Sequence, residues 1–281
     1  METQMAVEET KTLRVFKIVK EINSPNKYIY DLSYAGGAKI CLSVEVEDCR
    51  SGTYLLRNGD IEFVCYSGLH SFFLKTQRAF VFRNNFEKSI KMISLDSINT
   101  IREIISSHTF LDYIAHGMTE CKSGHLLICM WNGKLQDKSH GKVIKFELTT
   151  GTMRGEFALD KHRSLFTFPT YITENGNTDI CVSDVGEVVV IDERGVLRFR
   201  YLGLSKDSHF DPYGICADSE CNIIVADMKN EKIHMIDQNG RFICFVFYEN
   251  MKMPRALCID ENDNLYVSEW KNDQVKVISS Q

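Results

Sequence analysis

The chain has 281 residues, of which 44% are hydrophobic, and it carries a formal net charge of −5. That length accommodates a buried core, the acidic balance gives no long-range field for nucleic acid, and no apolar run reaches the roughly 18 residues of a transmembrane helix. Residues 1–12 are polar and acidic, which argues against a signal peptide. We therefore expect a cytoplasmic protein that binds neither DNA nor membrane.

Ten cysteines fall mostly within apolar, strand-like runs, as Cys41, Cys129 and Cys216 illustrate. No CxxC pair is present, and no spacing of Cys and His suits zinc. We interpret these residues as small buried hydrophobes in a reducing compartment, with disulfides of a secreted protein as the alternative. No metal and no cofactor are expected.

In chain order, a strand-like run at 13–20 precedes three loosely similar units, Tyr28–Tyr66, Ser71–Ser106 and His116–Asp160. Each unit holds short β-branched or aromatic runs separated by Gly, Asn and Asp turns, which is typical of antiparallel strands. An insertion, Asn132–Gly141, lengthens the third unit.

The second half contains a clear repeat. Pro169, Pro212 and Pro254 open successive units at spacings of 43 and 42 residues, and Cys216 and Cys258 keep the latter offset. Repeated four-stranded units at this spacing predict a β-propeller. A long helical period is missing throughout.

The two ends of the chain predict how the ring closes. The last unit ends near Ser279 after three strands, and the run at 13–20 can supply the missing fourth. We therefore predict an all-β fold, a single six-bladed β-propeller over residues 13–281, closed by an N-terminal strand that completes the last blade. Five or seven blades fit the length less well.

The repeats resemble a known family. Pro212-Tyr-Gly-Ile-Cys-Ala-Asp218, Asn222-Ile-Ile-Val-Ala-Asp227 and Lys232-Ile-His-Met-Ile-Asp237 are similar to the NHL repeat, specifically over 169–279 and weakly before that. The closest likeness is to the NHL propellers of tripartite-motif (TRIM) proteins. That resemblance implies a cytoplasmic target-recognition domain of a ubiquitin-ligase protein. These residues contain no RING, so we assign no ligase activity to them.

A binding face follows from propeller geometry. Loops between the second and third strands of each blade, and loops between blades, share one face. Trp, Tyr and Arg are common interface anchors. The candidate partner-binding residues on this face are Arg83, His116, Trp131, Lys134, Tyr171, Tyr213, Lys229, Arg255, Trp270 and Lys271. The plain alternative is a polar rim without a partner.

Acidic residues end the second strand of each clear unit, at Asp184, Asp227 and Glu269. We expect them to accept backbone N–H bonds and to pair with a basic residue on the next strand, such as Lys232 or Lys276. A metal channel built from these carboxylates is the weaker interpretation.

Three functions compete. The favoured one is a non-catalytic platform for a protein partner. The alternative is RNA binding, with basic and aromatic side chains of the same face contacting phosphates and stacking on bases. The third is a metal-dependent, lactonase-like hydrolase, which the inner strand starts disfavour because Thr170, Ala115, His116, Tyr213 and Arg255 offer few oxygen ligands.

Overall fold

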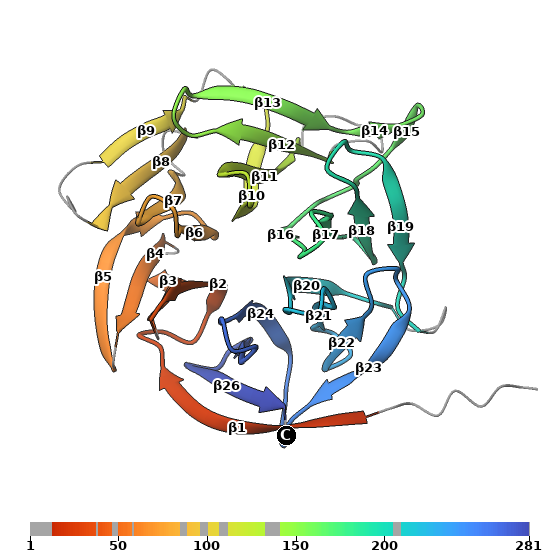
Figure 1. Ribbon diagram of the computed structural model, residues 1–281. Coiled ribbons are helices and arrows are strands. Elements are labelled where there is room, and N and C mark those ends of the chain that lie inside the picture. Colours follow the sequence, from red (N-terminus) through yellow and green to blue (C-terminus); the bar gives the residue numbers. More distant parts are fainter. Residues whose placement is uncertain are drawn as a thin grey trace, which may run out of the picture.

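The described residues form a ring of six blades around a central axis, with strands and no α-helix (Figure 1). The computed structural model describes residues 13–37, 39–46, 50–57, 59–84, 89–95, 101–106, 112–132, 141–204 and 209–280. The predicted tail 1–12 and the candidate Lys134 lie outside these ranges.

The first three blades come from the half of the chain with the weaker repeat. Blade 1 contains β2 (Ile29–Gly36), β3 (Lys39–Val46), β4 (Arg50–Arg57) and β5 (Asp60–Ser67). Blade 2 contains β6 (Ser71–Leu74), β7 (Ala79–Asn84), β8 (Ser89–Ser94) and β9 (Ile101–Ile105). Blade 3 contains β10 (Ile114–Glu120), β11 (His125–Trp131), β12 (Gly141–Glu147) and β13 (Thr152–Phe157).

A short hairpin of β14 (Leu159–Asp160) and β15 (Arg163–Ser164) leads into the regular half. Blade 4 contains β16 (Tyr171–Glu174), β17 (Ile180–Asp184), β18 (Glu187–Ile191) and β19 (Leu197–Tyr201). Blade 5 contains β20 (Pro212–Ala217), β21 (Ile223–Asp227), β22 (Lys232–Ile236) and β23 (Phe242–Phe247). Blade 6 contains β24 (Pro254–Ile259), β25 (Leu265–Glu269) and β26 (Gln274–Ser280).

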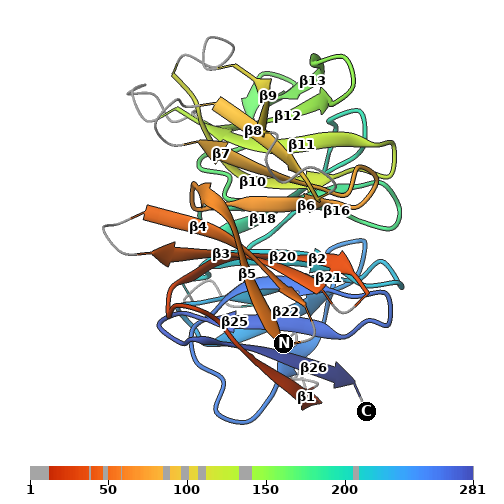
Figure 2. The same cartoon turned by 90° about the vertical axis from the view of Figure 1, so that its left-hand side faces the viewer.

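The strand β1 (Leu13–Asn23) closes the ring, as predicted. It runs antiparallel to β26, from Phe16 opposite Ser280 to Asn23 opposite Gln274. Figure 2 shows β1 and β26 side by side at one edge of the molecule. Its first residues also run parallel to β23, with Leu13 opposite Phe245, so one strand joins blades 5 and 6 into a single eight-stranded sheet.

The core lies between neighbouring blades. The second strands β17, β21 and β25 are buried along their whole length, because each is covered by a blade on either side. Eight of the nine described cysteines are buried and free, which confirms that they pack as small hydrophobes. Burial raises the pKa of the Cys41 thiol to about 12.

The carboxylates that end the second strands hold the scaffold together, with one difference from the prediction. Glu269 pairs with Lys276 at 3.0 Å, as predicted. Asp227 does not pair with Lys232. Its carboxylate accepts a hydrogen bond from the Asn230 amide at 2.8 Å and lies 3.4 Å from the Nε2 of His234. The ammonium group of Lys232 lies instead over the Phe245 ring, at 5.1 Å, where a cation–π contact replaces the ion pair.

Equivalent tight turns join the first and second strands of four blades. Each turn is closed by a backbone hydrogen bond and places its last residue at positive φ: Gly124 at 76°, Thr178 at 71°, Cys221 at 66° and Asp263 at 59°. Only glycine adopts this conformation without strain, and a β-branched residue is the least suited to it. Thr178 is therefore strained.

We predict that Thr178→Gly raises the free energy of unfolding by about 0.5–1 kcal/mol, because relief of the left-handed strain exceeds the extra unfolded-state entropy of glycine. Gly124→Thr is the reciprocal control. No atom lies near the added Cβ, so the positive φ alone should destabilise this variant. Chemical denaturation measures both. Equal stabilities for Thr178→Gly and the wild type would contradict the argument.

Candidate binding site at the mouth of the central channel

The inner strand of each blade places one side chain at the mouth of the central channel. Pro212 pairs with Asp227, Pro254 with Glu269 and Ala115 with Met130, and an irregularity follows each pair. The next residue of each strand therefore occupies an equivalent position. Extending this register to all blades gives a set that we call the mouth ring: Tyr30, His70, His116, Thr170, Tyr213 and Arg255.

A pocket of about 260 Å³ opens at this ring. Five mouth-ring residues line it, and its remaining wall is partly apolar, with Leu69, Phe168, Pro212 and Val185, and partly acidic, with Asp184 and Asp211. A pocket that combines an apolar wall with a few polar groups is the usual form of a binding site.

The next layer into the channel requires small residues. A Cβ on Gly214 would lie 2.5 Å from the carbonyl oxygen of Arg255, and one on Gly117 would lie 2.4 Å from that of Thr170. The inner strands thus approach one another at glycine. Tyr171 is the largest residue in this layer, and its side chain turns into the space between the inner strands.

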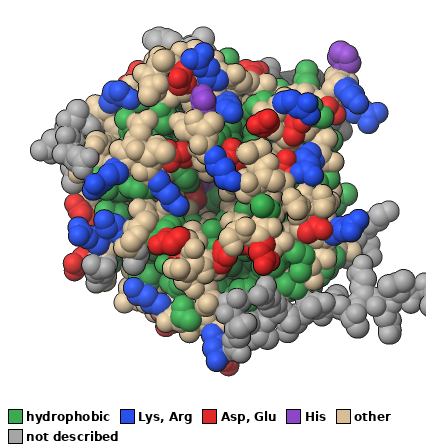
Figure 3. Space-filling view, in the orientation of Figure 1, with side chains coloured by type: hydrophobic (Ala, Val, Ile, Leu, Met, Phe, Trp, Pro, Cys, Tyr) green, Lys and Arg blue, Asp and Glu red, His purple; other side chains and the backbone are tan. Residues whose placement is uncertain are grey.

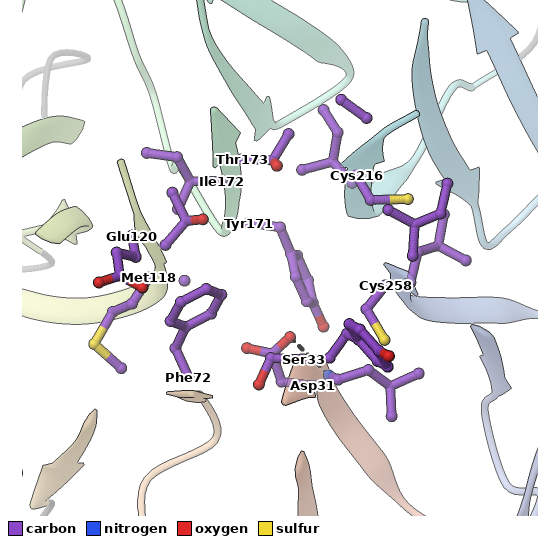
Figure 4. Close-up of a pocket in the computed structure, with 18 of the residues that line it drawn as sticks. Asp31, Ser33, Phe72, Met118, Glu120, Tyr171, Ile172, Thr173, Cys216 and Cys258 are labelled. Atoms are coloured by element: carbon purple, nitrogen blue, oxygen red, sulfur yellow. Dashed lines mark hydrogen bonds between the residues drawn. The ribbon is translucent and has the colours of Figure 1, made fainter. Parts of the chain in front are cut away.

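Tyr171 crosses the channel. Its hydroxyl donates a hydrogen bond to the backbone carbonyl of Tyr30, on the blade opposite in the ring. Figure 4 shows the ring reaching from β16 toward Asp31 and Ser33. Beyond it lies a second cavity of about 210 Å³, whose wall combines apolar side chains such as Leu32, Phe72 and Met118 with the charged side chains of Asp31, Lys75 and Glu120. Tyr171 lines both cavities and so stands between them.

On one side of the mouth, aromatic rings enclose the guanidinium of Arg255. It lies 4.3 Å from the Trp270 ring, 4.7 Å from Tyr213 and 5.3 Å from Tyr30. Trp270 also packs on Tyr28, with ring centroids 4.9 Å apart. We call these five residues the Arg255 cluster. It spans blades 5, 6 and 1, and each of its side chains is half-buried.

Opposite this cluster, His116 packs among other rings. Its centroid lies 5.0 Å from that of Phe168 and 5.8 Å from that of His70, and Trp131 stacks edge-on against Phe168 at 4.5 Å. We call these four residues the His116 cluster. Burial lowers the pKa of His116 to about 3, and His70 and Arg83 add to the effect. The imidazole is therefore neutral at physiological pH.

Two carboxylates, Asp184 and Asp211, line the pocket, and they differ in the hydrogen bonds that they accept. Asp184 accepts backbone N–H bonds from Thr167 at 2.6 Å, from Val185 at 2.8 Å and from Phe168. Burial nevertheless raises its pKa. Burial and the neighbouring Asp227 also raise the pKa of Asp211. Both carboxylates are thus partly buried groups whose charge the scaffold must offset.

The structure brings seven of the ten candidate residues around the mouth: Arg83, His116, Trp131, Tyr171, Tyr213, Arg255 and Trp270. Tyr171 lies one layer deeper than the loops and is only 5% exposed. Lys229 and Lys271 are exposed on the loops of blades 5 and 6, outside the pocket lining.

Sequence reasoning missed Tyr28, Tyr30, His70 and Phe168. Blades 1 and 2 lack the proline and glycine that mark the inner strand elsewhere. Matching Ile29-Tyr30 and Leu69-His70 to Pro212-Tyr213 would have located two of them.

Three features of the described residues bear on the kind of ligand that the site could bind. No group of three or more His, Cys, Asp or Glu able to hold a metal occurs among them. Within the same residues, no helix has the length and apolarity to cross a membrane. Figure 3 shows Lys and Arg interspersed with Asp and Glu over the face that it displays, rather than gathered by sign.

Comparison with known proteins shows the fold. Neither a family model nor a curated protein matches the chain. A streptogramin B lyase has a TM-score of 0.65 at 13% identity, covering 95% of this chain and 98% of its own. Virginiamycin B lyase from Staphylococcus aureus has 0.62 at 14%, covering 95% and 100%. A chain of a nidogen/laminin complex has 0.62 at 14%, covering 82% and 83%.

Similarity at such low sequence identity shows the fold and nothing about function. The predicted six-bladed β-propeller is confirmed, whereas membership of the TRIM family stays a prediction. What the lyases catalyse and what nidogen or laminin binds are properties of those proteins.

We predict that Tyr171→Phe lowers the free energy of unfolding by about 1–2 kcal/mol, because the Tyr30 carbonyl loses its donor inside the channel. Tyr28→Phe is the matched control, since the Tyr28 hydroxyl makes no hydrogen bond within the described residues and the ring contact with Trp270 is kept. Urea titration of the two variants compares them. Equal stabilities would show that the cross-channel bond contributes nothing.

Proposed function

We propose that this chain is a non-catalytic binding platform that recruits a protein partner through the mouth of its channel. The observation that carries the proposal is the Arg255 cluster, in which a guanidinium, a tryptophan and tyrosines lie half-buried beside a pocket. Trp, Tyr and Arg dominate the binding energy of protein interfaces, particularly where they surround a central pocket.

The cluster is organised before any partner arrives. Trp270 is held between Tyr28 at 4.9 Å and Tyr30 at 5.5 Å, and the hydroxyl of Tyr30 bonds to Glu45 at 3.2 Å. Side chains already fixed in this way lose little rotamer freedom on association, so more of the contact energy remains for affinity.

The non-catalytic assignment is supported by what the acidic residues already do. Asp184 accepts three backbone N–H bonds, Asp227 pairs with His234, and Glu269 pairs with Lys276. These carboxylates are committed to the scaffold of blades 4, 5 and 6. The neutral His116 is packed between aromatic rings, which restricts its movement as an acid or base.

The resemblance of the repeats gives this platform a context. We place it as the target-recognition domain of a TRIM-NHL-like ubiquitin-ligase protein in the cytoplasm. Protein is favoured over RNA because the exposed Lys229 and Lys271 flank the mouth singly, with Glu231 and Asp273 in the same loops. Phosphate binding needs several cations in a row.

We predict that Trp270→Ala reduces partner binding at least ~10-fold, as expected for a central anchor. Cross-linking mass spectrometry from cell extract compares proteins captured by the wild type, by Trp270→Ala and by Arg194→Ala. Arg194 is the control, because it lies in the turn between β18 and β19 on the opposite face. Thermal unfolding checks that each variant is folded.

Identical partner profiles for the wild type and Trp270→Ala would contradict the proposal. Captured RNA that falls away with added salt, in place of any protein, would point to the nucleic-acid alternative.

A further inference from the structure

Arg255 is a half-buried cation that forms no ion pair within the described part of the chain. Aromatic rings cover its guanidinium, its Nε is enclosed without a hydrogen-bond acceptor, and its Nη1 is 3.9 Å from the sulfur of Met228. The hydroxyl of Tyr171 and the carboxylate of Asp211 are its other polar neighbours. A guanidinium presents five N–H donors, and leaving them unpaired away from water is unfavourable.

A second side chain with an unpartnered polar atom lines the same pocket from the opposite blade. The Nε2 of His116 is enclosed and makes no hydrogen bond. Arg255 on blade 6 and His116 on blade 3 both line the cavity of about 260 Å³ at the mouth. Buried polar atoms in proteins are usually satisfied, so unpartnered nitrogens on two side chains that line one cavity favour a polar ligand there.

The other charged groups around the pocket are already balanced or nearly so. Asp31 accepts a hydrogen bond from His70 at 2.9 Å, and Asp184 accepts its three backbone N–H bonds. Lys229 and Arg255 both lower the pKa of Asp211, so the charge of this carboxylate is partly compensated. Among the side chains that line the pocket, the guanidinium of Arg255 is the cation, and it makes no direct hydrogen bond to an anion.

We infer that the mouth pocket binds one carboxylate, the side chain of a Glu or Asp on the protein partner, between Arg255 and His116. The inference rests on the proposed function and names the chemistry that the platform recognises. Arg255 pairs with the carboxylate through the edge of its fork, because the rings occupy its faces. The aliphatic stem of the side chain packs on Leu69 and Pro212.

A single carboxylate fits better than a phosphate backbone. Asp184 and Asp211 line the pocket and repel a polyanion, while one guanidinium neutralises one charge. Nucleic-acid binding is therefore an outcome that the experiment must separate from the inference.

The test selects a random phage-displayed peptide library on the immobilised full chain. We expect enrichment of peptides with a Glu or Asp at one fixed position. Calorimetry then compares an enriched peptide with its glutamine or asparagine analogue, which should bind roughly 10- to 100-fold more weakly, the loss expected for a charged hydrogen bond left unpaired.

Variants locate the contact. Arg255→Gln and Arg255→Lys should remove the preference for the acidic peptide, since neither provides a planar, charged fork. His116→Phe keeps the ring packing and should weaken the acidic peptide while leaving its amide analogue unchanged. Arg194→Gln, the same change on the opposite face, should alter neither.

Different failures have different meanings. Enriched peptides without an acidic position, or equal affinity for the amide analogue, would overturn the inference, although loss of binding in Trp270→Ala would preserve the proposed function. Peptide binding that is unchanged in Trp270→Ala and in Arg255→Gln would overturn the inference and the proposed function together. If the library yields no binding peptide and an oligouridine probe binds through Arg255, the pocket recognises phosphate and the carboxylate inference is overturned.

Discussion

The pairing of β1 with β26 is the interaction on which the rest of the structure depends. A propeller with an unpaired last strand would present an open edge and two blades free to separate. Here the first described strand completes the last blade and also runs beside β23, so it fastens blades 5 and 6 as well as closing the ring. The inner strands β2 and β24 then become neighbours. Only in that arrangement does Arg255 of blade 6 lie over Tyr30 of blade 1, with Trp270 against Tyr28.

Closure also determines what the channel contains. Six inner strands meet closely enough that Gly117 and Gly214 tolerate no Cβ, and the space this leaves is filled by one long side chain. The propeller is narrow enough at its centre for the side chain of Tyr171 to span the channel and bond to the opposite blade. The mouth pocket is consequently closed at its inner end by Tyr171. It suits a side chain inserted from the mouth rather than a peptide chain threaded through the channel.

Much of the fold could be predicted from the sequence. The spacing of Pro169, Pro212 and Pro254 located the second-half blades, and the missing last strand located the closure. The site was harder. Tyr213 and Arg255 follow a marker proline, whereas Tyr30 and His70 follow Ile29 and Leu69, where the repeat has lost its signal. The choice of His234 over Lys232 as partner of Asp227 depends on which side chain lies toward the carboxylate, and the repeat pattern does not encode that.

The most direct test of this account is a disulfide across the closing pair. Lys17 lies directly opposite Ser279 in the ladder of β1 and β26. If the ring closes in this register, Lys17→Cys combined with Ser279→Cys oxidises within the folded monomer, migrates faster on a non-reducing gel and gains about 2–4 kcal/mol of stability. Two thiols that stay free in the folded, oxidised protein would contradict the closure and the Arg255 cluster with it.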